Sequence, residues 1–228
     1  MSAPDARLRG LYGMVDLPAR RPGEPGGRGR TAPPAGRLAR ALIAGGARVL
    51  QLRMKGADAA AVLAVVDELR PLCRQKDLLF IVNDRLDVAL AGGADGVHLG
   101  QDDLPLAEAR RLAPAGFRIG ISTHNLAQAR AAAAGGADYI GFGPVFPTAS
   151  KQDPDPVVGV AQLAEVCRTV SVPVVAIGGI TRATVRDVVR AGAAAAALIG
   201  DVNHPAVEDP GAWMDAVTAA AREVSSAW

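Results

Sequence analysis

The sequence predicts an α/β fold, a closed parallel (β/α)₈ or TIM barrel with outer helices, and three observations support this prediction. Short apolar runs alternate with longer helix-like stretches through eight repeats. Many helix-like stretches end at glycine pairs such as Gly45-Gly46 and Gly135-Gly136, and glycine readily adopts the left-handed conformation that ends a helix. The length of 228 residues suits one barrel, which typically needs ~250 residues.

The expected strands are short runs rich in Val, Ile, Leu and Ala: Gly10–Val15, Arg48–Arg53, Leu78–Val82, Gly96–Leu99, Arg118–Ile121, Tyr139–Phe142, Val172–Ile177 and Ala194–Ile199. A helix is expected after each strand, over Gly36–Ala44, Ala57–Gln75, Arg85–Ala91, Leu106–Leu112, Leu126–Ala134, Val160–Thr169, Ala183–Ala191 and Trp213–Val224. An open doubly wound sheet is the alternative. It is less favoured because the count is eight and the repeat shows no obvious break.

We expect one domain over residues 1–228, with a single segment that does not fit the repeat. Leu17–Ala35 is rich in Pro, Gly and Arg and lacks apolar periodicity, so we interpret it as a flexible insertion. The alternative is a basic flap, because loops that follow strands lie on the catalytic face of a barrel. Such a flap would bring positive charge to the site from Arg20, Arg21, Arg28 and Arg30.

Composition excludes several classes of protein. The net charge of +2 argues against a general nucleic-acid or membrane-surface binder. Two cysteines, Cys73 and Cys167, cannot make a disulfide scaffold or a cysteine-ligated zinc site, and we interpret them as buried free thiols in a reducing compartment. No targeting or membrane-spanning segment is visible, so we expect a cytoplasmic protein. The sequence leaves open whether the chain forms a homo-oligomer.

The second, third and fourth predicted strands end in charged and amide side chains. Gln51, Arg53 and Lys55 share one face of their strand. Two cations next to an amide can bind an anionic ligand such as phosphate. Asn83-Asp84 and Asp102-Asp103 follow the next two strands, where either pair could simply cap a helix. Carboxylates beside cations are also how magnesium and diphosphate are held together.

The remaining strand ends carry small hydroxyls, glycines and a rare lysine. Ser122 follows the fifth strand, and Thr148, Ser150 and Lys151 lie in the loop after the sixth. Lysine is informative here because the chain has 22 Arg and only three Lys. Gly178-Gly179 and Gly200 follow the last two strands, where barrels of this kind usually bind phosphate. His98 is interpreted as a structural histidine.

Taken in order, these motifs make the chain similar to the thiamine-phosphate synthase (thiamine phosphate pyrophosphorylase) family, from about Leu11 to Gly200. The motifs are Gln51-Leu52-Arg53-Met54-Lys55, Asn83-Asp84-Arg85, Gly96-Val97-His98-Leu99-Gly100-Gln101-Asp102-Asp103, Ser122-Thr123-His124, Gly141-Phe142-Gly143-Pro144, Thr148-Ala149-Ser150-Lys151 and Ile177-Gly178-Gly179-Ile180. The resemblance implies a magnesium-dependent transferase. It joins hydroxymethylpyrimidine diphosphate to thiazole phosphate through a pyrimidinylmethyl cation, and pyrophosphate leaves.

The resemblance also implies a role for each candidate residue. Gln51, Arg53, Lys55 and Asn83 would hold the pyrimidine diphosphate, and Asp84 and Asp103 would bind Mg²⁺. Ser122 would contact the pyrimidine and Lys151 the diphosphate, so that the catalytic set is Arg53, Lys55, Ser122 and Lys151. Thr148 and Ser150 would contact the thiazole, with its phosphate near Gly179, Ile199 and Gly200.

The chain departs from the family pattern at the end of the last strand, where Leu198-Ile199-Gly200 stands in place of the usual Val-Ile-Ser. The insertion at 17–35 is also longer than expected. One alternative function is a thiazole tautomerase-like enzyme, which does not need a diphosphate–metal site. Another is a non-catalytic sensor of a phosphate ligand, with the Arg-rich insertion as its partner-binding arm.

Overall fold

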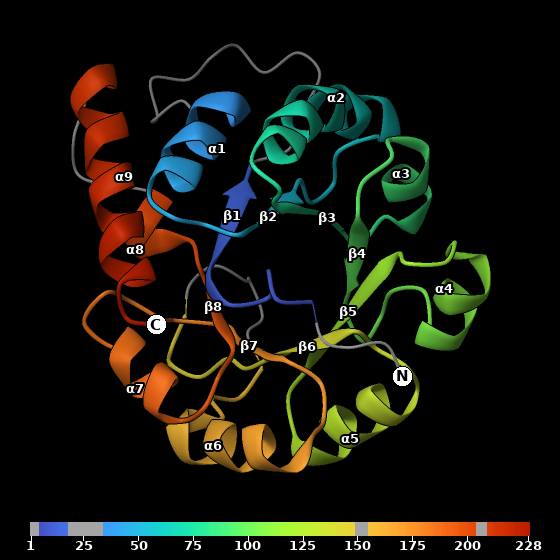
Figure 1. The fold of residues 1–228 in the computed structure, drawn as a ribbon. Coiled ribbons are helices and arrows are strands. Elements are labelled where there is room, and N and C mark those ends of the chain that lie inside the picture. Colours follow the sequence, from blue (N-terminus) through green and yellow to red (C-terminus); the bar gives the residue numbers. More distant parts are fainter. Residues whose placement is uncertain (1–4, 18–33, 149–154, 204–208) are drawn as a thin grey trace.

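A computed structural model describes residues 5–17, 34–148, 155–203 and 209–228 of the chain. Eight parallel strands form a closed barrel in which β1 pairs with β8. Figure 1 looks along this barrel, with the strands in the middle and the helices around them. The closed barrel confirms the predicted fold, and the open doubly wound alternative is wrong.

The strands are β1 (Gly10–Asp16), β2 (Val49–Arg53), β3 (Leu79–Asn83), β4 (Gly96–Leu99), β5 (Arg118–Thr123), β6 (Tyr139–Phe142), β7 (Val174–Ala176) and β8 (Ala195–Leu198). The helices are α1 (Ala35–Ala44), α2 (Ala59–Gln75), α3 (Leu86–Ala91), α4 (Leu106–Leu112), α5 (Leu126–Ala134), α6 (Gly159–Thr169), α7 (Val185–Arg190), α8 (Gly200–Asn203) and α9 (Pro210–Ser225).

Every predicted strand and helix is present; β4, β6, α4 and α5 have the predicted ends, and the ends of the others are shifted. β5 runs on to Thr123, so that Ser122 is part of a strand. β7 begins only after Pro173, which has no N–H to donate to a neighbouring strand. The short helix α8 was not predicted. Most of the expected insertion, at 18–33, lies outside the described residues.

The strands separate two apolar cores. Alternate residues of β1 show the division, since Leu11 and Val15 pack with the outer helices while Tyr12 and Met14 point into the barrel. The inner core is completed by residues of other strands, namely Val49, Leu79, Ile81, Tyr139, Val175 and Ala195. Side chains therefore fill the barrel interior.

Gly120 on β5 makes room for the largest of these inner side chains. A Cβ atom at Gly120 would lie 2.1 Å from Cζ of Tyr139, which is far closer than two carbon atoms can approach. Tyr139 itself is fully buried. The ring position of Tyr139 therefore depends on the absence of a side chain at residue 120.

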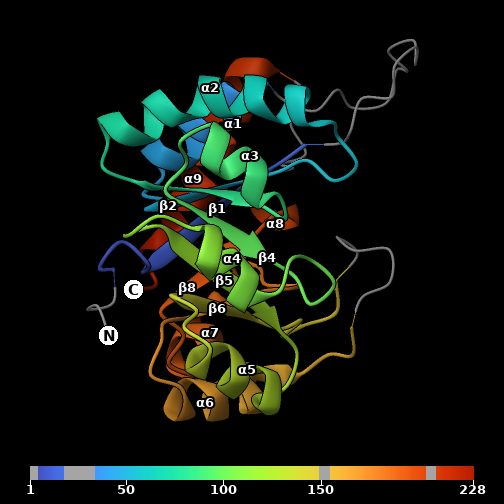
Figure 2. The ribbon, with the colours of Figure 1, turned by 90° about the vertical axis from the view of Figure 1, so that its right-hand side faces the viewer.

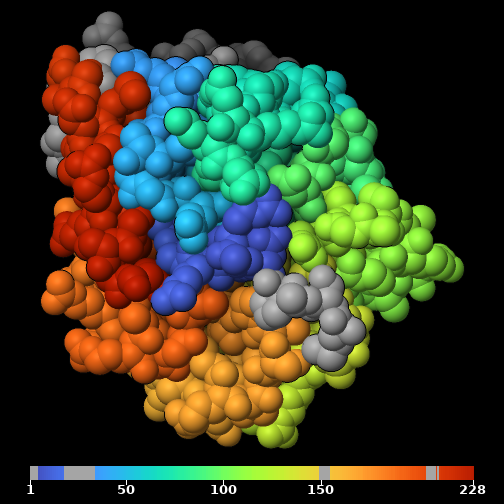
Figure 3. All heavy atoms as spheres, viewed as in Figure 1, coloured from blue at the N-terminus to red at the C-terminus, as the bar shows by residue number. Residues whose placement is uncertain are grey.

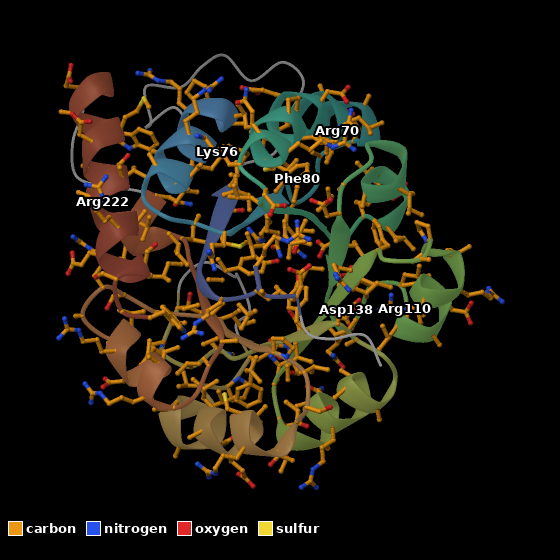
Figure 4. All side chains as sticks on the ribbon, viewed as in Figure 1. Arg70, Lys76, Phe80, Arg110, Asp138 and Arg222 are labelled. Carbon is orange, nitrogen blue, oxygen red and sulfur yellow. The ribbon has the colours of Figure 1, made fainter. Side chains whose placement is uncertain are left out.

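Ion pairs join the outer helices to the strands. The Asp138 carboxylate, just before β6, accepts hydrogen bonds from the Ile119 backbone N–H (2.8 Å) and from Nη2 of Arg110 on α4 (2.6 Å). Figure 4 shows Arg110 and Asp138 next to each other, and Nη1 of Arg118 lies 3.4 Å from the same carboxylate. These contacts attach α4 to the barrel at the start of β5 and β6.

The two ends of the barrel differ. In Figure 2 the C-terminus lies at one end, while α8, directly after β8, lies towards the other. Figure 3 faces the first end, where the segment before β1 (blue) fills the centre of the ring. The cleft described below is instead built from the carboxyl ends of the strands.

We predict that Gly120→Ala destabilises the protein by roughly 1–3 kcal/mol, because the added methyl group forces the Tyr139 ring out of its position. Urea unfolding measures the effect. Gly200→Ala is the matched control, since a Cβ at Gly200 would have no atom of the other described residues within 4 Å, apart from its chain neighbours and the backbone of its own helix. Equal unfolding free energies for the two variants would contradict the prediction.

Candidate active site

A cleft of about 730 Å³ occupies the carboxyl end of the barrel. All predicted site residues among the described ones line it: Gln51, Arg53, Lys55, Asn83, Asp84, Asp103, Ser122, Thr148, Gly179, Ile199 and Gly200. The structure therefore brings together side chains from strands far apart in the sequence. The other two predicted residues, Ser150 and Lys151, lie outside the described residues.

Both strand-end cations in the cleft are paired with carboxylates. Nη1 of Arg53 lies 2.6 Å from Oδ1 of Asp16, and Nζ of Lys55 lies 2.8 Å from Oδ2 of Asp84. The sequence analysis missed Asp16, although it is the last residue of β1 and stands beside Arg53 in the β1–β2 register. Asp16 holds the Arg53 guanidinium at the rim, where it can meet an anion.

Asp84 and Asp103 are not helix caps. The N-cap residues of α3 and α4 are Arg85 and Pro105, and neither helix has a side-chain capping bond. Asp84 instead has a backbone φ of +63°, which is uncommon for a residue other than glycine. Oδ2 of Asp103 accepts a hydrogen bond from the Gly100 N–H at 2.7 Å. The capping alternative for these two residues is therefore wrong.

The two carboxylates affect each other electrostatically. Burial raises the pKa of Asp103, and the neighbouring Asp84 charge raises it further, while the hydrogen bond from the Gly100 N–H and the charge of Lys55 oppose the shift. Two carboxylates held this close in a protein are stabilised by a shared cation.

The donor set fits Mg²⁺ bound together with a phosphate ligand. In the described part of the chain, no group of three or more His, Cys, Asp or Glu side chains could hold a metal ion. Mg²⁺ does not need such a cage, because it is usually held by one or two carboxylates and by substrate phosphate and water oxygens. Asp84 and Asp103 supply two carboxylates, and Arg53 and Lys55 supply positive charge for the phosphate beside them.

A chain of five hydrogen-bonded side chains crosses the floor of the cleft. Nε2 of Gln51 lies 3.0 Å from the Tyr12 hydroxyl, which lies 2.7 Å from the Tyr139 hydroxyl. The Tyr139 hydroxyl lies 3.1 Å from Nδ1 of His98, and Nε2 of His98 lies 2.9 Å from Oγ of Ser122. All five residues line the cleft.

Sequence reasoning missed Tyr12 and Tyr139, although a signal was present. They are the two tyrosines of a chain with only 4% aromatic residues, and both fall on predicted strands. The interpretation of His98 as a structural histidine agrees with its two hydrogen bonds. Burial lowers the pKa of His98 to about 4, against a smaller raising effect of Asp103, so its ring is uncharged near neutral pH.

The glycines after β7 allow two loops to cross closely. Gly179 has a φ of +66°, and a Cβ atom there would lie 2.3 Å from the Pro147 carbonyl oxygen. Phe146 N–H donates to the Gly178 carbonyl at 3.1 Å, which ties the loop after β6 to the loop after β7. This crossing puts Thr148 and Gly179 in the same cleft.

The profile of the family described as thiamine monophosphate synthase matches residues 30–202. The chain belongs to this family. It is 52% identical over 199 residues to the thiamine-phosphate synthase of Methanocella arvoryzae, covering 87% of this chain and 88% of the relative. It is 50% identical over 165 residues to that of Methanospirillum hungatei, covering 72% and 80% of the two chains.

A solved structure supports the same assignment to the thiamine monophosphate synthase family. The thiamine phosphate pyrophosphorylase from Pyrococcus furiosus superposes with a TM-score of 0.79 at 35% identity, covering 97% of this chain and 98% of that one. The resemblance drawn from the strand-end motifs is thereby confirmed.

The raised pKa of Asp103 gives a prediction for stability. An acid whose folded pKa exceeds its unfolded pKa of about 3.9 reduces stability at higher pH, because the unfolded chain loses its proton more readily. We predict that Asp103→Asn, without Mg²⁺ at neutral pH, is more stable than the parent chain. The difference in unfolding free energy between Asp103→Asn and the parent becomes smaller as the pH falls through the raised Asp103 pKa, because the parent carboxylate becomes protonated.

Urea unfolding in the presence of a chelator, at neutral and at acidic pH, measures this difference in unfolding free energy. Asp87→Asn is the control, since Asp87 lies on α3 outside the cleft lining and pairs with Arg85 at 2.6 Å. An Asp103→Asn protein less stable than its parent at neutral pH would refute the electrostatic account of the carboxylate pair.

Proposed function

We propose that the chain is a magnesium-dependent thiamine-phosphate synthase. It condenses hydroxymethylpyrimidine diphosphate with thiazole phosphate, giving thiamine phosphate and pyrophosphate. One observation carries the proposal: the neighbouring carboxylates Asp84 and Asp103 lie beside two cations in the cleft of a chain from this family.

The reaction needs charge stabilisation and no nucleophilic side chain. The bond between the pyrimidine methylene carbon and the diphosphate oxygen breaks, and its electron pair leaves with pyrophosphate. The thiazole nitrogen then donates its lone pair to the pyrimidinylmethyl cation and forms the new C–N bond. Bound Mg²⁺ supplies charge neutralisation for the departing pyrophosphate. Arg53 and Lys55 neutralise the rest from the cleft, and we assign the same role to Lys151 from its sequence motif.

The other residues bind and orient the two substrates. Gln51, Asn83 and Ser122 hold the pyrimidine end of the first substrate, and Asp84 and Asp103 hold Mg²⁺. Thr148 and Ser150 contact the thiazole, and backbone N–H groups near Gly179, Ile199 and Gly200 hold its phosphate. Lys55 is free to turn from Asp84 to the diphosphate once a metal cation neutralises that carboxylate.

The alternative functions have less support. A thiazole tautomerase-like enzyme has no need for the Asp84–Asp103 pair with its adjacent cations. A non-catalytic sensor of a phosphate ligand has no need for a metal. No helix among the described residues is long and apolar enough to cross a membrane. A cytoplasmic enzyme acting on small molecules is consistent with this finding and is part of the proposal.

The decisive assay measures pyrophosphate release from the two substrates together, from each alone, and with or without Mg²⁺. We predict release that needs both substrates and the metal. Asp103→Asn should lower turnover about a hundredfold or more, equivalent to roughly 3 kcal/mol of lost transition-state stabilisation. Asp87→Asn should keep parent turnover. Metal-independent turnover, or an active Asp103→Asn protein at limiting Mg²⁺, would contradict the proposal.

A second prediction concerns Gly200, where the chain departs from its family. Glycine keeps a backbone N–H for the thiazole phosphate but lacks the serine hydroxyl. Gly200→Ser should therefore change the affinity for thiazole phosphate by only about 1 kcal/mol, the value of one hydrogen bond. Calorimetric titration compares the two proteins. Binding by Gly200→Ser together with no binding by the parent would mean that this chain has lost its second substrate site.

A further inference from the structure

The short helix α8, directly after β8, completes the rim of the cleft. Its first two residues, Gly200 and Asp201, line the cleft, and Gly179 lines it from the loop after the neighbouring strand β7. Among the described residues, neither the Gly179 N–H nor the Gly200 N–H has a hydrogen-bond acceptor. Two backbone donors at this rim are therefore not used by contacts within the described chain.

A side chain of α8 takes the place of the Gly200 N–H in the sheet. β1 and β8 pair as far as Gly13 and Leu198, and the same register continued by one step would bring the Gly200 N–H to the Met14 carbonyl. That carbonyl instead accepts a hydrogen bond from Nδ2 of Asn203 at 2.6 Å. Asn203 is 1% exposed, so water does not compete for this bond. The Asn203 amide therefore holds α8 on β1 and leaves the Gly200 N–H out of the sheet.

A carboxylate joins α8 to the loop after β7. Oδ2 of Asp201 accepts two hydrogen bonds from Arg182, one from the backbone N–H at 2.7 Å and one from Nε at 3.0 Å. Arg182 belongs to the same loop as Gly179. The pair of bonds therefore links the two segments that carry the unused N–H groups.

The position of Asp201 is unusual for a site that binds an anion. A carboxylate in the lining of the cleft repels a phosphate nearby. Arg182 compensates this charge and is not itself among the residues that line the cleft. Asp201 therefore contributes to such a site through the bonds that it accepts, and its negative charge opposes binding.

We propose that Asp201 and Arg182 are positioning residues for the phosphate end of the second substrate. Their two hydrogen bonds fix the separation between the loop after β7 and α8, so that the Gly179 and Gly200 N–H groups reach one phosphate together. This inference rests on the proposed function, which supplies thiazole phosphate as that substrate.

Two variants of Asp201 separate the hydrogen bonds from the charge. Both bonds from Arg182 go to the same oxygen, so Asp201→Asn can keep both with its amide oxygen while it loses the charge. Asp201→Ala loses the bonds and the charge. The KM for thiazole phosphate should rise about tenfold in Asp201→Ala and stay at or below the parent value in Asp201→Asn.

A role of Asp201 through its charge alone gives a different result. Both substitutions would then remove the same repulsion and lower the KM for thiazole phosphate equally. An Asp201→Ala protein whose KM does not exceed that of the parent would overturn the proposal. An equal rise in Asp201→Asn and Asp201→Ala would overturn it as well.

The KM for the pyrimidine diphosphate separates positioning of the second substrate from a general loss of structure. This KM should stay at the parent value in Asp201→Ala, because the cations and carboxylates proposed to hold the diphosphate follow β2, β3 and β4. The kcat should also stay unchanged, since the lost contact serves the bound substrate and the transition state alike. Equal rises in both KM values would make Asp201 a structural residue only and overturn the proposal.

Glu223→Gln is the matched control. Glu223 on α9 is the other carboxylate beside Arg182, with Oε2 3.4 Å from Nη1, and it lies outside the cleft lining. The control should keep the parent KM for both substrates. A rise in the thiazole phosphate KM of Glu223→Gln as large as that of Asp201→Ala would overturn the specific role of Asp201.

These outcomes are separable from failure of the proposed function. If the parent chain releases no pyrophosphate from the two substrates, the proposed function is wrong and the positioning roles fall with it. If the parent chain is active but the Asp201 variants do not differ as expected, the synthase assignment stands and the positioning roles are wrong.

Discussion

Closure of the parallel sheet between β1 and β8 is the constraint on which the rest of the structure depends. Because all eight strands run in the same direction, closure brings their carboxyl ends to one rim, and every described candidate residue lies there. Closure also encloses an interior that side chains must fill. The small residues of β8 and the absence of a side chain at Gly120 leave space for Tyr12 and Tyr139.

The rim gathers charges that would repel one another without their partners. Arg53 is held by Asp16 and Lys55 by Asp84, while burial and the Asp84 charge raise the pKa of Asp103. Two neighbouring carboxylates destabilise the protein when no ligand is bound. Such an arrangement is typical of a site that binds a charged ligand. A divalent cation would relieve the repulsion between the two carboxylates and leave Lys55 available to a diphosphate.

The sequence was sufficient for the barrel and for much of the rim because both depend on local patterns. Apolar runs predict the strands, and glycines predict where the helices end. Once the strands are placed, Asp84 and Lys55 are seen directly to lie at strand ends. Partners across the barrel are not local. Asp16 and Tyr139 contact residues on other strands, so their roles depend on side-chain directions that only the folded chain defines. The four-residue helix α8 is too short to give a periodic pattern.

The central claim, that the Asp84–Asp103 pair binds the metal which holds the diphosphate, is tested most directly by anomalous diffraction. Crystals grown with Mn²⁺ in place of Mg²⁺, together with pyrophosphate and thiamine phosphate, would locate the metal and both products. The account predicts an anomalous peak between the two carboxylates, with pyrophosphate oxygens among the metal ligands and Arg53 and Lys55 beside them. A metal bound away from both carboxylates, or products bound outside the cleft, would contradict it.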